Sequence, residues 1–168
     1  AIDINKKTLQ WAKKNGDLNA IENIKWKCGD LLNGVRGKFD LIITNPPQMP
    51  MISGPQHDWG GKNGRIFIDR IIHSAPAHLN PNGKLIMLLF DFLNVVSPYG
   101  DIETIVETCR NNNLIAKVIS KKIRYINPDG KTIKSLPVIK NAYPRYKFKK
   151  KGDKLFHYVY VLSCAKRD

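Results

Sequence analysis

The sequence has few cysteines and no long apolar segment. Its three cysteines, Cys28, Cys109 and Cys164, are an odd number and widely spaced, which argues against a disulfide framework and against a zinc site. The longest wholly apolar run, 85–90, is far short of the roughly 20 residues that span a bilayer, and no secretory signal is visible. We therefore expect reduced, buried thiols in a cytoplasmic protein with no bound metal and no membrane partner.

Acidic residues are scarce in the last third of the chain. The whole sequence carries 28 Lys and Arg against 14 Asp and Glu, but residues 113–168 hold 15 basic and 3 acidic side chains. Such an imbalance predicts contact with a polyanion, the alternative being a solvated lysine-rich surface. Aromatic residues are interleaved with the basic ones over 121–154, as in surfaces that bind single-stranded RNA. Substrate binding is therefore expected at Lys149, Lys150 and Lys151.

Short β-rich runs alternate with helical stretches, the order of an α/β domain on a mostly parallel sheet. Strands are expected up to Ile4 and over 24–28, 39–44, 84–92, 114–126 and 156–164, the last two antiparallel. Helices are expected over 6–15, between Asn5 as cap and Gly16 as stop, around 68–75, and over 102–109, starting near Asp101. The sequence thus predicts one domain, 1–168, with turn residues at 80–83 and a basic insertion at 127–154.

Polar residues follow three of the expected strands at their carboxyl ends, where open α/β sheets bind ligands. Asp3 is placed to accept hydrogen bonds from a ribose diol, or else to stabilise a helix N-terminus. Asp30 is placed to accept from an adenine amino group, or else to form an Asx turn. Asn45 follows the run 39–44, which is apolar on both faces as in an interior parallel strand.

The segment Asn45-Pro46-Pro47 is the most specific of these signals. Two prolines fix the backbone and remove two N–H donors, and Pro46 drives Asn45 toward an extended conformation. The resulting rigid turn offers carbonyl and carboxamide acceptors, which suits the binding of an –NH2 group. A purely structural turn is the alternative.

Three runs together resemble class I S-adenosylmethionine-dependent methyltransferases, and among these the HemK-type protein-glutamine methyltransferases: Ala1-Ile2-Asp3-Ile4-Asn5, Gly29-Asp30-Leu31 and Phe39-Asp40-Leu41-Ile42-Ile43-Thr44-Asn45-Pro46-Pro47. The resemblance implies a Rossmann-like three-layer fold and S-adenosylmethionine as cofactor. It further implies that Asp3 binds the ribose, that Asp30 binds adenine with Ile4 and Leu31 packed on the ring, and that Asn45, Pro46 and Pro47 form the catalytic turn.

The chain departs from that family at two places. Relatives usually carry Tyr or Phe after the second proline, where this chain has Gln48; Gln48 and Trp59 are expected to contact substrate, although Trp59 would serve equally as a loop anchor. The family also has a first strand and a glycine-rich loop, which would precede Ala1. We therefore expect an N-terminally truncated portion of a longer protein, or another segment in that place.

These features predict an S-adenosylmethionine-dependent N-methyltransferase that acts on a planar –NH2 nitrogen. The resemblance favours a glutamine amide on a protein of the translation machinery, with an activating partner subunit as a further expectation. Two alternatives stay open: methylation of an RNA or DNA base amino group, and a non-catalytic RNA-binding module that keeps the fold.

Overall fold

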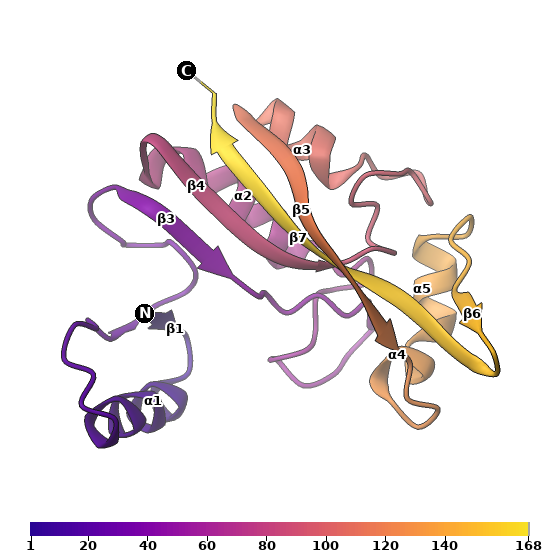
Figure 1. Ribbon diagram of the computed structural model, residues 1–168, viewed down its shortest axis with the longest axis horizontal. Coiled ribbons are helices and arrows are strands. Elements are labelled where there is room, and N and C mark those ends of the chain that lie inside the picture. The colour runs from indigo at the N-terminus through magenta and orange to yellow at the C-terminus, as the bar shows by residue number, and fades with distance from the viewer. Residues whose placement is uncertain (168) are drawn as a thin grey trace. The chain divides into compact units, whose positions relative to one another are not determined.

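The computed structural model describes residues 1–167, which form two compact units, 1–37 and 38–167. Figure 1 labels their elements, apart from the short β2. The first unit contains β1 (Ile2–Asp3), α1 (Lys6–Leu18) and β2 (Lys27–Cys28). Its two short strands pair in parallel, with Asp3 opposite Cys28.

Helix α1 begins where the sequence predicts and ends later. The Asn5 side chain accepts hydrogen bonds from the backbone N–H groups of Lys7 and Thr8, so it caps the helix as expected. The predicted end at Gly16 is wrong, because the helix continues to Leu18. Gly16 is instead a packing residue: a Cβ there would lie 3.3 Å from the ring of Trp26. The expected strand over 24–28 is reduced to its last two residues.

The second unit is built on a five-stranded sheet. Strand β3 (Phe39–Thr44) pairs in parallel with β4 (Leu79–Phe90), and β7 (Lys154–Lys166) lies antiparallel between β4 and β5 (Leu114–Tyr125). The short β6 (Lys149–Lys151) pairs with one end of β7. The predicted antiparallel pairing of the last two long strands is therefore confirmed.

Strand β3 has the predicted bounds, Phe39–Thr44. Within the described residues it pairs with β4 alone and lies at an edge of the sheet. Leu41 and Ile43 are 50% and 71% exposed. The interior position expected for β3 stays a prediction, because the strand that the resemblance places along its other edge would precede Ala1.

Two helices lie on one face of this sheet, α2 (Ile66–His78) and α3 (Ile105–Asn111) (Figure 1). The predicted apolar stripe of α2 is buried in full: Ile68, Ile71, Ile72 and Ala75. The expected start of α3 near Asp101 is wrong, because Thr104 and Glu107 form a reciprocal capping box that sets the first turn there.

Strand β4 follows α2 without a separate turn. The predicted turn residues 80–83 form an irregularity inside the strand, where the pairing with β3 steps from Leu79 to Lys84. Asn82 adopts φ +64° within it, which asparagine tolerates better than most residues. The strand ends at Phe90, two residues earlier than expected.

The basic insertion folds onto the body of the second unit. It contains α4 (Lys131–Lys134), α5 (Leu136–Ala142) and β6. Ile139, Tyr143 and Tyr146 are buried, and the Tyr143 hydroxyl donates to the backbone carbonyl of Asn63 at 2.6 Å. The segment is therefore more than a solvated hairpin, and its apolar side chains extend the core.

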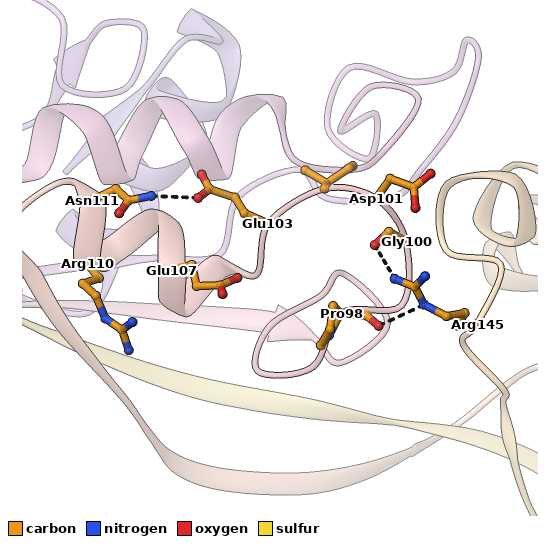
Figure 2. Close-up of a pocket in the computed structure, with 9 residues that line it drawn as sticks. Pro98, Gly100, Asp101, Glu103, Glu107, Arg110, Asn111 and Arg145 are labelled. Atoms are coloured by element: carbon orange, nitrogen blue, oxygen red, sulfur yellow. Dashed lines mark hydrogen bonds between the residues drawn. The ribbon is translucent and has the colours of Figure 1, made fainter.

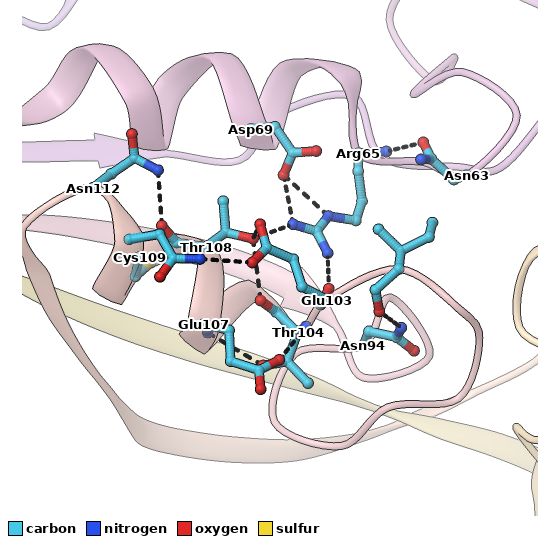
Figure 3. Close-up of polar contacts among 12 residues, drawn as sticks. Asn63, Arg65, Asp69, Asn94, Glu103, Thr104, Glu107, Thr108, Cys109 and Asn112 are labelled. Atoms are coloured by element: carbon cyan, nitrogen blue, oxygen red, sulfur yellow. Dashed lines mark hydrogen bonds and ion pairs between the residues drawn. The ribbon is translucent and has the colours of Figure 1, made fainter.

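A buried arginine joins α2 to α3 (Figure 3). The Arg65 guanidinium donates to the Asp69 carboxylate, to the Thr108 hydroxyl and to the backbone carbonyl of Glu103. Its side chain is 1% exposed, so these bonds replace all of its contacts with water. They fix the N-terminal ends of both helices relative to each other.

The thiols are buried in two cases of three. The sulfur atoms of Cys109 and Cys164 lie 3.6 Å apart between α3 and β7, while Cys28 is exposed, so the expectation of a buried thiol is wrong for Cys28. Among the residues that the structure describes, no helix is long and apolar enough to cross a membrane.

Candidate active site

In the first unit, Asp3 ends β1 as the sequence predicts. One of its carboxylate oxygens accepts the backbone N–H of Asn5 at 2.7 Å, and the other accepts no hydrogen bond from the described residues. Ile4 follows with about half of its surface exposed. The end of β1 therefore has one carboxylate oxygen, on Asp3, that could accept ribose hydroxyls, followed directly by the exposed apolar side chain of Ile4.

Asp30 follows β2 at the corresponding end of the second strand. The Gly29 N–H donates to the carbonyl of Asp3, so Asp30 and Asp3 belong to one hydrogen-bonded turn region. The Asn33 side chain donates to the Asp30 carboxylate at 3.3 Å. Leu31 is half-buried and adopts φ +54°, a left-handed conformation that is rare for a leucine. The predicted adenosine residues thus lie together within residues 1–37.

In the second unit, Asn45 directly follows β3 and the turn Asn45-Pro46-Pro47 ends the strand. The parallel ladder stops at Thr44, opposite Met87. Beyond it Pro46 and Pro47 have no N–H to donate, so the backbone cannot pair further. Pro46 is buried and Asn45 is exposed. The rigid turn predicted from the sequence is therefore placed at the carboxyl end of a parallel strand.

Gln48 lies inside the protein, directly after the turn. Its side chain is 4% exposed. The carboxamide nitrogen donates to the carbonyl of Leu88 at 2.8 Å and lies 3.2 Å from Asn45 Oδ1 and 3.4 Å from the Pro46 carbonyl oxygen. A primary amide nitrogen of the protein thus lies within hydrogen-bond distance of the two acceptors that are predicted to hold a substrate –NH2 group.

The loop after the turn is anchored by Trp59. The indole N–H donates to the carbonyl of Met51 at 3.0 Å, and Trp59 forms an isolated β-bridge with Met49. Gly60 lies close against the backbone of Gln48, where a Cβ would come within 2.8 Å of the Gln48 Cα. These contacts favour the loop-anchor interpretation of Trp59, and its contact with substrate stays a prediction.

A polar cluster that the sequence analysis missed lies at the carboxyl end of β4. Asp91 is buried there and accepts the Tyr146 hydroxyl at 2.8 Å. His157 Nδ1 and Lys149 Nζ lie 3.8 and 3.9 Å from its carboxylate oxygens. The signal was available, because Asp91 directly follows the apolar run 85–90 just as Asn45 follows 39–44.

Burial sets the protonation of this cluster. Burial raises the pKa of the Asp91 carboxyl, against the lowering effect of the Tyr146 hydrogen bond and the nearby Lys149 charge. Burial also raises the pKa of the Tyr146 hydroxyl, which keeps it neutral as a donor. It lowers the pKa of His157 to about 4. Within the described residues His157 Nε2 has no hydrogen-bond partner, so a neutral ring with a proton on Nδ1 fits this site.

The three predicted basic residues form β6, beside this cluster. Lys149, Lys150 and Lys151 are exposed. The Lys149 ammonium lies 5.0 Å from the centre of the Tyr158 ring, and Lys121 lies 3.8 Å from the same ring. Tyr158 is stacked with Tyr160. Cations therefore lie against aromatic faces here, but these rings belong to β7. Two of the interleaved aromatic residues expected over 121–154, Tyr143 and Tyr146, are buried instead, and substrate binding at Lys149, Lys150 and Lys151 stays a prediction.

An open pocket of about 640 Å³ lies elsewhere in the second unit (Figure 2). It is bordered by the loop from Pro98 to Glu103, by α3 and by Arg145. Arg145 donates to the carbonyls of Pro98 and Gly100, so it holds these two positions of the loop next to each other. None of the site residues predicted from the sequence lines this pocket.

Comparison with known proteins gives the class of this α/β protein. The methyltransferase small domain family matches residues 1–118. The chain belongs to that family, and the predicted resemblance to class I methyltransferases is confirmed.

Individual relatives match part of the chain. A protein of Methanocaldococcus jannaschii, provisionally named a protein N5-glutamine methyltransferase, is 37% identical over 94 residues, which cover 52% of this chain and 47% of that protein. The release factor glutamine methyltransferase of Deinococcus radiodurans is 31% identical over 100 residues, which cover 53% of this chain and 36% of that protein. The chain thus spans less than half the length of these curated relatives.

A solved structure supports the fold. The crystal structure of a methyltransferase from Pyrococcus furiosus superposes with a TM-score of 0.58 at 22% identity, covering all of this chain and 62% of that one. The Rossmann-like fold class predicted from the sequence is therefore confirmed.

Proposed function

We propose that this chain forms part of an S-adenosylmethionine-dependent N-methyltransferase whose methyl acceptor is a glutamine side-chain amide. The observation that carries the proposal is the Gln48 carboxamide nitrogen on Asn45 Oδ1 and the Pro46 carbonyl. This contact supports the idea that the turn accepts an amide –NH2 group. The names of the Methanocaldococcus and Deinococcus relatives support glutamine as the amino acid.

The residues of the first unit fit the adenosine portion of S-adenosylmethionine. The oxygen of Asp3 without a partner would accept the ribose hydroxyls, and Asp30 would accept the adenine amino group. Ile4 and Leu31 would pack against the adenine ring. When bound, S-adenosylmethionine would supply an electrophilic methyl group on a positively charged sulfur, and the broken C–S bond would leave its electron pair on that sulfur as a neutral thioether.

The turn residues of the second unit would prepare the acceptor nitrogen. An amide lone pair is delocalised and weakly nucleophilic, so its orientation matters more than a strong base. Asn45 Oδ1 and the Pro46 carbonyl would each accept one N–H of the substrate amide, which fixes the amide plane and so the direction of the lone pair, perpendicular to that plane. The same two oxygens would stabilise the positive charge that develops on nitrogen. Once methylated, the nitrogen would lose its proton to water.

The test uses the full-length protein with S-adenosylmethionine labelled in its methyl group. Purified release factor, ribosomal protein and RNA serve as acceptors. We expect label in a protein band; label in an RNase-sensitive band would favour base methylation instead. Asp3→Ala should weaken cofactor binding in calorimetry at least tenfold. Asn45→Ala should bind the cofactor normally and lose turnover at least a hundredfold, and normal turnover of that variant would refute the assignment of the turn.

A second candidate, RNA binding, is favoured by the surface around β6. Lys121 and Lys149 lie over the ring of Tyr158, and the surrounding segment is strongly basic. We propose that this surface contacts RNA, either as a substrate or beside a protein substrate that is bound to RNA. Absence of cofactor binding together with retained RNA binding would favour a non-catalytic module.

A further inference from the structure

The two prolines of the catalytic turn leave the end of β4 without a backbone partner on the side of β3, although its other side pairs with β7. The β3–β4 ladder ends at Thr44 and Met87, and the next two residues after Asn45 have no N–H. On β4, the Leu88 carbonyl therefore has no backbone N–H donor on the side of the turn, and the Phe90 N–H on the same side lies beyond the last pair of the ladder. An unpaired buried backbone group is costly, so another part of the chain must bond to them.

The side chain of Gln48 provides that partner. Its nitrogen donates to the Leu88 carbonyl at 2.8 Å and its oxygen accepts the Phe90 N–H at 2.8 Å. In a parallel ladder, the N–H and C=O of one residue bond to two residues of the neighbouring strand that lie two positions apart, and Leu88 and Phe90 are such a pair. The carboxamide thus adds one further rung to the ladder after the prolines have ended it.

The same carboxamide also reaches the acceptors of the turn. Its nitrogen has two hydrogens, and one is directed at Leu88. The second is shared between Asn45 Oδ1 at 3.2 Å and the Pro46 carbonyl at 3.4 Å. Each of those oxygens has two lone pairs, so each retains one for a second donor.

We propose that Gln48 is a positioning residue for the amino-group acceptors of Asn45 and Pro46. Its side chain links the turn to β4 by hydrogen bonds. Its N–H donates to Asn45 Oδ1, which holds the Asn45 carboxamide in the orientation that places its oxygen on the same side as the Pro46 carbonyl oxygen. In the flipped orientation, the Asn45 –NH2 would face the Gln48 –NH2, donor against donor. Gln48 therefore selects the orientation in which both turn oxygens are available to one substrate nitrogen. This inference rests on the proposed function of the turn.

Two substitutions in the full-length protein separate the roles of the Gln48 amide. Gln48→Glu keeps an oxygen for the Phe90 N–H but removes the N–H donor while the carboxylate is ionised. Gln48→Met has similar length and removes both polar groups. With purified release factor as acceptor, we expect Gln48→Glu at pH 8 to lower kcat at least tenfold. The KM for the acceptor and the Kd for S-adenosylmethionine should stay within twofold.

The pH profile adds a measurement that a general loss of stability would not produce. Protonation of the introduced carboxyl restores a donor toward Asn45, so activity of Gln48→Glu relative to the unsubstituted protein should rise as the pH falls from 8 to 6. Gln48→Met should show no such rise. A lowered KM with unchanged kcat in either variant would overturn the proposal, because it would mean that the Gln48 amide competes with substrate.

Hydrogen exchange keeps this inference separate from the proposed function. The Phe90 amide should exchange at least tenfold faster in Gln48→Met than in Gln48→Glu, whether or not any acceptor is methylated. Equal exchange in both variants would overturn the placement of Gln48. Exchange can differ as expected while the unsubstituted protein transfers no methyl group to the release factor. In that case the proposed substrate is wrong, and the contact of the Gln48 side chain with Leu88 and Phe90 stands.

Discussion

Replacing Arg65 by methionine should destabilise the second unit by about 3 kcal/mol. The guanidinium is almost fully buried and donates to three separate groups, the Asp69 carboxylate, the Thr108 hydroxyl and the Glu103 carbonyl. Removing one member of a buried ion pair costs about 3–5 kcal/mol, because the remaining groups are left without partners. The Asp69 side chain is 42% exposed, so water can reach it again, which places the expected loss at the lower end of that range.

The measurement is urea unfolding followed by circular dichroism. Arg65→Lys should lose less stability than Arg65→Met, because lysine keeps the positive charge. It should still be less stable than the unsubstituted protein, because lysine cannot form the forked contact with Asp69 and Thr108. The matched control is Lys150→Met, which removes an exposed ion pair with Asp153 at 3.8 Å and should leave the free energy of unfolding unchanged within error. A free energy of unfolding for Arg65→Met within about 0.5 kcal/mol of the unsubstituted protein would refute this account of the contact between α2 and α3.

Two further predictions concern charge. The folded protein holds the pKa of His157 at about 4 against 6.5 in the unfolded chain, so the unfolded state takes up the proton first and stability falls as the pH drops below about 6.5. By pH 5 this proton uptake lowers the free energy of unfolding by about 2 kcal/mol, while the raised pKa of Asp91 acts in the opposite sense. In urea unfolding, His157→Phe should lose less stability between pH 6.5 and 5 than the unsubstituted protein. Identical pH dependence in both proteins would contradict this account of His157. Replacing Lys150 and Lys151 together by alanine should reduce the salt dependence of binding to single-stranded RNA by a log–log slope of about 1.4. Replacing Lys6 and Lys13 should change that slope less, and equal changes would count against a specific role for β6.

The sequence predicted those parts of the fold that depend on side-chain periodicity. The stripe of α2 at Ile68, Ile71, Ile72 and Ala75 is buried as expected, and the Asn5 cap lies where its side chain can reach two free N–H groups. Helix ends were less predictable. Gly16 resembles a stop signal, but its missing side chain serves the close approach of Trp26.

The candidate site was predictable in its anchors and not in its supporting contacts. Asp3, Asp30 and Asn45 follow strands as their positions in the pattern indicate. The role of Gln48 depends on Leu88 and Phe90, forty or more residues away in sequence, and no local pattern encodes that contact. The Asp91 cluster likewise joins β4 to residues of β7 and to Tyr146, which come together only in the folded sheet.

The position of β7 has a consequence for how the second unit is made. Strands β4 and β5 do not touch as neighbours; each pairs with β7, which comes last among these strands in the sequence. During synthesis on the ribosome, helices α2 and α3 would have no continuous sheet to pack on until residues 154–166 emerge. Such distant pairing slows folding, so the backbone N–H and C=O groups along one edge of β4 and of β5 would stay unpaired in the nascent chain until β7 is inserted between them.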